Sequence, residues 1–415
     1  MSVGTDAPPL IVMKFGGTSL ATEEGRRRIA AKVASEKAAG SRIVLVVSAM
    51  GRMGDPYATD TLLSLIDASY VSPHERDVLM STGELISAVV LSAELNRQGI
   101  AACALTGADA GVRTDGRDGD ATILAIDPGF LSAVLDENLV AVVAGFQGSD
   151  DAGLLNTLGR GGSDTSACAL AVALGAKRLE IYTDVDGVYT ADPRTVHDAQ
   201  VLTRITAEEL YQMASHGSKV VHAPAAELAL GSGIAMRVRN TFSDAPGTEV
   251  LALSQYRPSA VATAISTADG ITRLRLRLPY VKEDAQAHMA GQAAVYRVLA
   301  DAGISIDMFT PMNDRVVFSI ASEDLERATS ALADLGLEMA SRPKLGKVTL
   351  IGAGMHGVPG VMAQVADCLA KEGIDILQVA DSHATISLLL DEEDVLCAAR
   401  ALHAAFGLGD VAQTS

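Results

Sequence analysis

The stretch LIVMKFGGTSL, residues 10–20, is an apolar run that ends in a lysine and two glycines. The run predicts a buried strand, and a lysine at its end is costly to desolvate unless an anion neutralises it. Two glycines let the backbone approach a ligand closely, and their N–H groups can point at phosphate oxygens. We therefore predict a phosphate site of Lys14, Gly16 and Gly17 at the carboxyl edge of a sheet. It is not a Walker loop, where the lysine follows the glycines.

Apolar runs of this kind alternate with helical patterns up to about residue 250. Further strands are predicted at residues 42–50, 139–146, 178–185 and 234–242, and a helix is predicted between the first two strands, closing on Gly40. Two capping boxes, Ser72 to Glu75 and Thr206 to Glu209, predict helix starts. Continuous apolar strands separated by helices are typical of a parallel or mixed sheet that helices cover.

Length, charge and cysteine content narrow the class of protein. The 415 residues carry a net charge of −18, which disfavours nucleic acid as the main partner. No apolar run approaches the length of a membrane span, and residues 1–9 lack the features of a signal peptide, so we expect a cytoplasmic protein. The four cysteines lie far apart in the sequence, as expected for buried free thiols.

The chain changes character after Pro258, where a repeat begins. Segments 293–309 and 363–379 share a helix–glycine–strand pattern, seventy residues apart, and an alternating strand and an acidic helix follow each. We interpret them as a tandem repeat of a small α+β unit, joined at residues 341–347.

A second glycine pair lies in LGRGGSDTSACALAVALGA, residues 158–176, where Arg160 precedes Gly161 and Gly162. Ser163 and Asp164 are placed to cap a helix that runs to Gly175. Capping alone does not explain an arginine before two glycines at an anion-attracting helix end. Two basic–Gly–Gly helix starts in one chain suggest two anionic groups held near each other.

Glu84 continues an apolar helical stripe with Ala88, Leu91 and Leu95. A carboxylate in that position is either exposed on the helix or buried with a cationic partner, and the pattern leaves both open.

Two further stretches are candidates for nucleotide-binding loops near the carboxyl ends of strands. Residues 182–194 follow a predicted strand, and their spacing rules out an EF-hand. Lys219 lies just past a predicted helix end, where its positive charge could equally stabilise the C-terminal end of the helix dipole. GAGMHG, residues 352–357, matches a dinucleotide fingerprint, but too few residues follow for a dinucleotide fold.

Together these stretches resemble the aspartate kinase family of the amino-acid kinase superfamily. The resemblance rests on KFGGTSL, VVSAMG, TGELIS, TLGRGGSDTSA, YTDVDGVYTADPR, GSKVVH and RVRNTFSDAPGT, in the family's order. It covers residues 10–408, and MGRMGDPYATD is similar to the bacterial monofunctional branch that responds to diaminopimelate. It implies an α/β fold with a helix-sandwiched sheet, then two ferredoxin-like ACT units. The expected domains are a flexible segment 1–9, a catalytic domain 10–250 and ACT units 260–340 and 345–408.

The resemblance implies a role for each matching residue. Its catalytic residues match Lys14 and Asp164. Its nucleotide contacts match Lys14, Gly16, Gly17, Ser48, Thr183, Asp184, Tyr189, Arg194 and Lys219. Its aspartate contacts match Thr59, Glu84, Arg160 and Ser163. The tentative effector contacts are Met289, Gly291, Ile304, Ile306, Asp307 and Val358. No metal ligand from the protein is assigned.

The implied reaction is ATP- and Mg²⁺-dependent phosphorylation of the β-carboxylate of L-aspartate, the first step of aspartate-derived amino-acid biosynthesis, including that of lysine. That carboxylate is already ionised at pH 7, so no general base is needed. Arg160 would clamp the α-carboxylate and Glu84 would accept the ammonium. Two alternatives stay open: a non-catalytic amino-acid sensor on a kinase scaffold, and a kinase for another acidic amino acid.

The resemblance also implies regulation and assembly. We expect an amino-acid effector (lysine, threonine or diaminopimelate), a homodimer or larger assembly, and neither nucleic-acid nor membrane binding. Many family members carry a Pro-Gly turn at the start of the first ACT unit, whereas this chain has Gly291 without the proline. We therefore predict weak or altered feedback, with effector contacts at a turn from Met289 to Gly291.

Overall fold

The computed structural model describes residues 8–256, 260–278, 285–355 and 357–410. The segment 1–9, expected to be flexible, therefore lies almost wholly outside the described residues. The described chain forms two compact units. The first comprises residues up to Tyr189 and from Val201 to Arg257, and the second comprises Thr190–Gln200 and the chain from Pro258 onward.

An eight-stranded sheet organises the first unit, with strand order β10-β12-β11-β9-β1-β2-β6-β3. All neighbouring strands are parallel except β11 and β12. A second sheet has the order β5-β4-β7-β8. The strands are β1 (Leu10–Phe15), β2 (Arg42–Val47), β3 (Ala102–Leu105), β4 (Val112–Thr114), β5 (Ile123–Ile126), β6 (Val140–Ala144), β7 (Gln147–Ser149), β8 (Leu155–Thr157), β9 (Arg178–Thr183), β10 (Arg204–Thr206), β11 (Met236–Asn240) and β12 (Thr248–Leu251).

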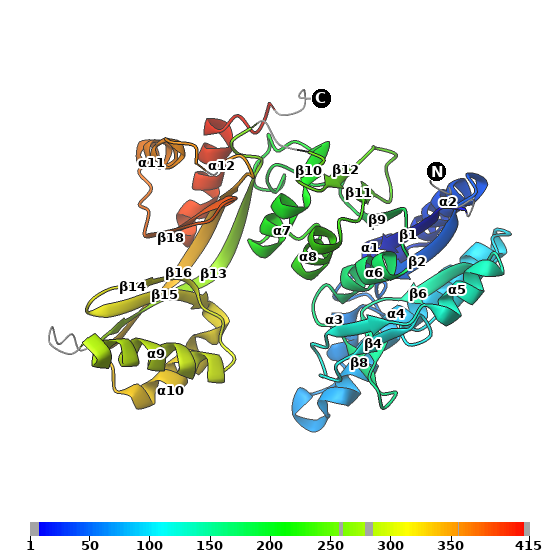
Figure 1. Ribbon diagram of the computed structural model, residues 1–415, viewed down its shortest axis with the longest axis horizontal. Coiled ribbons are helices and arrows are strands. Elements are labelled where there is room, and N and C mark those ends of the chain that lie inside the picture. Colours follow the sequence, from blue (N-terminus) through cyan, green and yellow to red (C-terminus); the bar gives the residue numbers. More distant parts are fainter. Residues whose placement is uncertain (1–7, 257–259, 279–284, 356, 411–415) are drawn as a thin grey trace, which may run out of the picture. The chain divides into compact units, whose positions relative to one another are not determined.

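Helices lie on both faces of the large sheet (Figure 1). They are α1 (Gly17–Ala21), α2 (Glu23–Ala38), α3 (Thr59–Leu63), α4 (Pro73–Arg97), α5 (Gly129–Asp136), α6 (Gly162–Ala173), α7 (Ala207–Ser215) and α8 (Ala223–Ser232), with a 3₁₀ turn at Ala68–Tyr70. Helices α2 and α4 build the core on one face, with Ile11, Met13 and Phe15 of β1. Helix α6 packs on β1, β2 and β9. The predicted helix-sandwiched sheet is confirmed.

The two capping boxes predicted from the sequence are confirmed. Both capping boxes form, at Ser72 with Glu75 and at Thr206 with Glu209. Helix α4 is long and apolar enough to cross a membrane by length and composition, but half of its most apolar window is buried in the protein. We therefore interpret α4 as a core helix of the first unit.

A six-stranded antiparallel sheet organises the second unit, with strand order β14-β15-β13-β16-β18-β17. The strands are β13 (Ala264–Arg277), β14 (Asp307–Pro311), β15 (Arg315–Ala321), β16 (Met339–Ile351), β17 (Gln378–Asp381) and β18 (Thr385–Asp391). The helices are α9 (Ala285–Asp301), α10 (Leu325–Leu332), α11 (Val361–Lys371) and α12 (Val395–Ala405), with 3₁₀ turns at Ser322–Asp324, Ala333–Leu335 and Glu392–Asp394.

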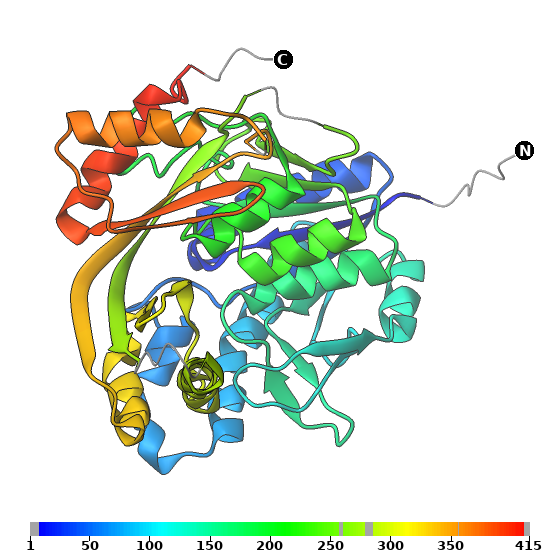
Figure 2. The ribbon, with the colours of Figure 1, turned by 60° about the vertical axis from the view of Figure 1, so that its left-hand side comes forward.

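Strands β13 and β16 are long enough to serve both repeats (Figure 2). Residues 271–277 of β13 pair with β15 of the first repeat, whereas residues 264–268 pair with the end of β16 beside β18. The second repeat therefore takes one strand from chain that precedes the first repeat. Residues 341–347, expected to join the two copies, form no separate linker and lie within β16. In this segment β16 passes from its pairing beside the first repeat to its pairing with β18 of the second.

Residues 190–200 fold with the second unit although they interrupt the first in sequence. The backbone N–H of Ile265 donates to the Thr190 carbonyl at 2.7 Å. The buried His403 Nε2 and Thr190 Oγ1 share a hydrogen bond of 2.9 Å, and Arg400 Nε donates to the Thr195 carbonyl at 2.7 Å. Helix α12 thus anchors a segment that the sequence assigns to the catalytic domain.

Candidate active site

A pocket of about 560 Å³ lies at the carboxyl ends of the central parallel strands of the first unit. The sequence-predicted residues that line it are Lys14, Gly17, Ser48, Thr59, Glu84, Arg160, Ser163 and Asp164. These residues come from β1, from the loops after β2 and after β8, and from α1, α3, α4 and α6. Such crevices beyond the strand ends are where open α/β sheets bind ligands.

Lys14 and Asp164 form an ion pair at the N-terminal end of α6. Lys14 Nζ lies 2.6 Å from Asp164 Oδ1, and both side chains are largely buried. The second carboxylate oxygen accepts the backbone N–H of His222 at 3.3 Å. The lysine that ends β1 therefore has a fixed counter-charge, which holds its ammonium at the edge of the pocket.

The predicted capping role of Ser163 and Asp164 was wrong. Helix α6 begins at Gly162, its N-cap is Gly161, and no side chain caps it. Ser163 and Asp164 instead lie in the first turn and face the pocket. Gly161 has a left-handed φ of 76°, and a Cβ there would lie 2.2 Å from Cγ of His222. Only glycine admits this helix start beside the histidine.

Glu84 is buried on α4, 3% exposed, on the stripe that it shares with Ala88, Leu91 and Leu95. Its Oε1 accepts the backbone N–H of Ala49 at 3.0 Å, while its buried Oε2 has no hydrogen-bond partner in the described structure. Burial raises the pKa of Glu84 to about 8, and the Ala49 hydrogen bond and the Lys14 charge oppose that rise. A buried carboxylate with one vacant oxygen is suited to a cationic ligand group.

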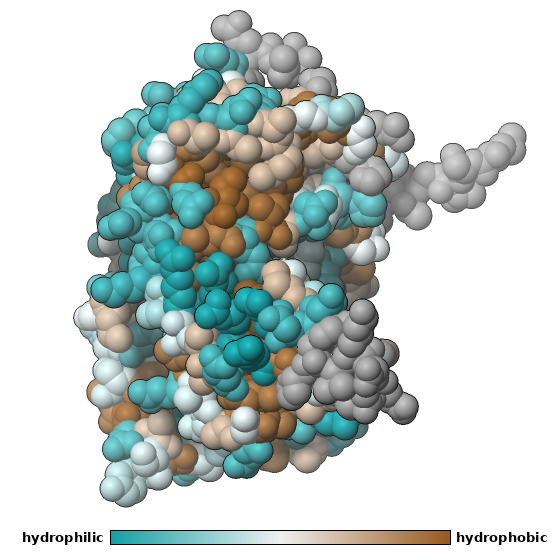
Figure 3. Space-filling model, turned by 90° about the vertical axis from the view of Figure 1, so that its left-hand side faces the viewer, coloured by the Kyte–Doolittle hydropathy of each residue, from teal (hydrophilic) through white to brown (hydrophobic). Residues whose placement is uncertain are grey.

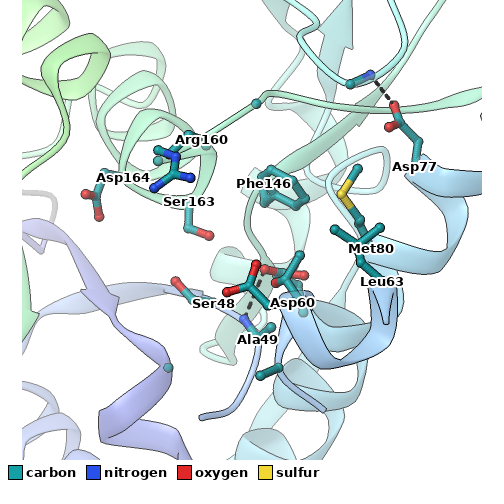
Figure 4. A pocket seen from close by; sticks show the side chains of 18 of the residues that line it. Ser48, Ala49, Asp60, Leu63, Asp77, Met80, Phe146, Arg160, Ser163 and Asp164 are labelled. Carbon is teal, nitrogen blue, oxygen red and sulfur yellow. Dashed lines mark hydrogen bonds between the residues drawn. The ribbon is translucent and has the colours of Figure 1, made fainter. Parts of the chain in front are cut away.

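The two sides of the pocket differ in chemistry (Figure 4). Arg160, Ser163 and Asp164 lie on one side, and Met80 and Phe146 lie across from them. Arg160 is exposed within the pocket, so its guanidinium is available to an anion.

The two glycines after Lys14 have different roles. A Cβ on Gly17 would lie 2.4 Å from the Ala49 carbonyl oxygen, so the close approach of the loop after β2 requires glycine there. The N–H of Gly16 donates to the Tyr182 carbonyl at 3.3 Å, and a Cβ on Gly16 would lie 3.9 Å from Lys14 Nζ. Gly16 therefore leaves room beside the lysine ammonium.

Several other predicted nucleotide contacts lie outside the lining of this pocket. Asp184 follows β9 and pairs with Arg52, which does line the pocket, at 2.5 Å. Lys219 is exposed and follows the C-terminal end of α7. Tyr189 is also absent from the pocket lining, and burial raises the pKa of its hydroxyl. Arg194 belongs to the second unit and pairs with Asp192 at 2.6 Å.

The pocket also contains residues that sequence reasoning missed. His222 occupies the N-cap position of α8 without a side-chain capping bond, and its backbone N–H donates to Asp164 beside Lys14. Burial lowers the pKa of its side chain. Asp77 is fully buried and accepts the N–H groups of Gly119 and Thr157 at 2.9 and 2.7 Å, which ties α4 to the loop between β4 and β5 and to the end of β8. Asp77 lies seven residues before Glu84, two helical turns along the same face, and that spacing could have revealed it.

None of the six tentative effector residues is among those that line this pocket. The turn expected from Met289 to Gly291 was wrong, because these residues lie within α9. Ile304 is buried in the core of the first repeat, and Ile306 packs against that core. Asp307 pairs with Lys347 at 2.5 Å, and Val358 is exposed.

Comparisons with known proteins agree with this arrangement. A model described as the amino acid kinase family matches residues 9–240, and a model described as an ACT domain matches residues 340–404. Aspartokinase 1 of Bacillus subtilis is 41% identical over 408 residues, which cover 96% of this chain and 99% of that protein. This chain belongs to the aspartokinase family. The aspartokinase of Geobacillus stearothermophilus is 37% identical, over 97% of this chain and 98% of that protein.

Solved aspartokinases share the fold. The crystal structure of E. coli aspartokinase III in complex with aspartate and ADP has a TM-score of 0.83 and 27% identity, and covers 96% of this chain and 100% of that one. The same enzyme with lysine and aspartate has a TM-score of 0.72 at 27% identity, over 96% of this chain and 99% of that one. The predicted family and fold class, including its ACT region, are therefore confirmed, and the chain is a kinase.

Proposed function

We propose that this aspartokinase-family chain transfers the γ-phosphoryl group of ATP to the β-carboxylate of L-aspartate. The observation that carries the proposal is the pocket's charge pattern. Lys14, paired with Asp164, lies at the end of β1, and the exposed Arg160 and the buried Glu84, with one unpaired oxygen, line the same cavity. Aspartate offers one ammonium and two carboxylates, which this pattern can receive separately.

Two residues would hold the backbone groups of aspartate. The vacant Oε2 of Glu84 would accept the α-ammonium, which satisfies a buried oxygen that otherwise lacks a partner. The Arg160 guanidinium would bind the α-carboxylate through two parallel hydrogen bonds. Thr59 and Ser163 line the same space and would donate hydroxyl hydrogen bonds. With both ends fixed, the β-carboxylate is left to meet the phosphate.

Lys14 would neutralise the phosphates. We assign the remaining nucleotide contacts to Gly16, Gly17, Ser48, Thr183, Asp184, Tyr189, Arg194 and Lys219, in keeping with the family motifs that they match. Among the described residues no cluster of three or more His, Cys, Asp or Glu could hold a metal ion. We propose that Mg²⁺ is carried mainly by the triphosphate and its waters, as is usual for that ion, and that it would supply further charge neutralisation.

The chemistry needs positioning more than proton transfer. The β-carboxylate is ionised at pH 7 and is itself the nucleophile, so the obstacle is its repulsion from the triphosphate. Lys14 would offset that repulsion where charge develops in the transition state. Asp164 would act by holding the lysine ammonium at 2.6 Å in the required direction.

The proposal extends to regulation, assembly and location. We propose an amino-acid effector at the repeats (lysine, threonine or diaminopimelate), a homodimer or larger assembly, and a cytoplasmic location. All four cysteines are free thiols, which is consistent with a reducing compartment. An effector would act by favouring one arrangement of the chain over another. The product would enter aspartate-derived amino-acid synthesis, including that of lysine.

The direct test traps the acyl phosphate as a hydroxamate. Purified protein with MgATP should form aspartyl hydroxamate with L-aspartate, and little product with L-glutamate or without an amino acid. No product at saturating substrates would favour a non-catalytic sensor, whereas a preference for glutamate would favour a kinase for another acidic amino acid.

Arg160→Lys tests the assignment within the pocket. The substitution keeps the charge but loses the planar fork, so the KM for aspartate should rise about tenfold or more with the KM for ATP nearly unchanged. Arg52→Lys is the matched control at the pocket edge, where Arg52 pairs with Asp184. A rise confined to the KM for ATP in Arg160→Lys would move this residue to the phosphate site.

A further inference from the structure

A group of arginines lies on one face of the six-stranded sheet. On β13, Leu274 and Leu276 point into the core under α9 and α10, so the alternating Arg273 and Arg275 point to the opposite face. Arg315 on β15 flanks the core residue Val316 and belongs to the same opposite face.

The strand register places like charges against each other. Arg273 lies directly opposite Arg342 of β16, and Arg277 lies directly opposite Arg315. Like charges in directly opposite positions of an antiparallel pair destabilise a sheet. The arrangement is unexpected in a chain whose net charge is −18. It becomes favourable when an anion lies between the arginines.

Four of these arginines, but not Arg277, line a pocket of about 610 Å³. Both repeats contribute to it, because the side chain of Gln378 on β17 donates to Thr310 Oγ1 on β14 at 3.0 Å and so links the two edge strands. The volume lies within the range of small-molecule sites. The lining comprises Arg273, Arg275, Thr310, Met312, Arg315, Val317, Ala340, Ser341, Arg342, Leu377, Gln378 and Val379.

The positive charge of this pocket is only partly offset. Arg342 pairs with Asp391 at 2.7 Å and Arg315 pairs with Asp314 at 2.6 Å. Arg273 donates to the Leu377 carbonyl at 3.1 Å, and Arg275 has no ion pair with a described residue. Burial, followed by the charges of Arg342 and Arg275, lowers the pKa of Arg273. Among the described residues, Arg273 and Arg275 therefore have no carboxylate as an ion-pair partner.

One buried acceptor in the pocket is also unsatisfied. The side-chain oxygen Oε1 of Gln378 is buried and has no hydrogen-bond partner in the described structure, although the amide nitrogen is used. A buried acceptor without a partner destabilises the fold. A ligand that brings an O–H or N–H donor would satisfy it.

We propose that this pocket binds a small polyanion with two or more carboxylate or phosphate groups and one hydroxyl or N–H donor. The anionic groups would lie between Arg273, Arg275 and Arg342, and the donor would face Gln378 Oε1. Figure 3 shows strongly hydrophilic side chains gathered beside hydrophobic ones on the side of the molecule that faces left in Figure 1. The site is separate from the pocket of the kinase reaction and lies wholly within the second unit.

Isothermal titration of the full-length protein with citrate, without nucleotide or Mg²⁺, tests the proposal. Citrate carries three carboxylates and a hydroxyl, and tricarballylate has the same carboxylates without the hydroxyl. We expect one citrate per chain, with tricarballylate bound about tenfold more weakly because Gln378 loses its donor. Pyrophosphate in a parallel titration distinguishes a phosphate-bearing ligand from a carboxylate.

Two variants locate the binding. Arg275→Gln, at an exposed strand position that the fold tolerates, should weaken citrate about tenfold, and Arg273→Gln/Arg275→Gln should weaken it further. Arg327→Gln on α10 removes an exposed arginine of the same unit that pairs with Asp324, and should bind as the wild type does.

Three results would overturn the proposal. The first is the absence of citrate and pyrophosphate binding. The second is binding unchanged in the double variant, which would assign the anion to another site such as the Lys14 pocket. The third is a change of oligomeric state in Arg275→Gln, seen by sedimentation, without a change in anion affinity, which would make this face a contact between copies. None of these measurements depends on kinase activity.

Discussion

Replacing Glu84 by glutamine should stabilise the free protein and impair aspartate binding at the same time. The side chain is 3% exposed, and burial raises its pKa from 4.5 to about 8. A carboxyl group whose pKa is higher in the folded state favours the fold fully at low pH, and this contribution is lost as the pH rises towards the folded pKa. Glutamine has nearly the same shape and no proton to lose, so it escapes that penalty.

The size of the effect follows from the two pKa values. Between pH 4.5 and 8 the penalty grows by about 1.4 kcal/mol per pH unit and reaches about 3 kcal/mol at pH 7. Urea unfolding of Glu84→Gln against the wild type should therefore show a small gain in unfolding free energy at pH 5 and a gain of about 3 kcal/mol at pH 7. Glu94→Gln, on the same helix but paired with Arg97, is the control and should show no such pH-dependent gain.

The same substitution should weaken the binding of aspartate. If Glu84 Oε2 accepts the ammonium of aspartate, Glu84→Gln loses a charge-assisted hydrogen bond of about 1.5–3 kcal/mol, which raises the KM for aspartate about tenfold to a hundredfold. Because Glu84 is mostly protonated at pH 7, aspartate binding to the wild type should release about one proton. Calorimetry in two buffers of different ionisation enthalpy measures this release. An unchanged KM in the variant, or no proton release in the wild type, would refute the reasoning.

Three further outcomes test the catalytic and regulatory units. Lys14→Ala should lower kcat far more than it raises KM, since the lost charge meets the transition state, and a pure KM effect of equal size would limit Lys14 to ATP binding. Gly17→Ala should lower the melting temperature and the activity together, because its Cβ would lie 2.4 Å from the Ala49 carbonyl oxygen. Gly40→Ala is the control: its surroundings are open and its φ of 84° still strains alanine, so it should leave the activity intact. Thr190→Val leaves the Gln200 N–H and the His403 ring without their hydrogen-bond partner, at a cost of about 2 kcal/mol. Hydrogen exchange of amides 190–200 should therefore become faster, and unchanged exchange would contradict the anchoring role.

The sequence by itself determined the elements and much of the catalytic pocket. Capping at Ser72 and Thr206 depends on residues three apart, so the pattern contains all that the backbone needs. The period of a helix placed Glu84 on the face of Ala88, Leu91 and Leu95 but left its burial open, and the structure shows that it is buried. The resemblance to the aspartate kinase family then brought together residues that no local signal connects.

Only the tertiary structure decided which distant groups meet. Lys14 pairs with Asp164 and His222 lies over Gly161 because α6 and α8 pack beside the strand edge, and no spacing in the chain encodes that contact. The same holds for residues 190–200, which fold against α12, and for Arg273 opposite Arg342, which follows from strand register. Local propensity concerns a few neighbouring residues, whereas these contacts depend on the path of the whole chain, and that path is set by burying the two cores.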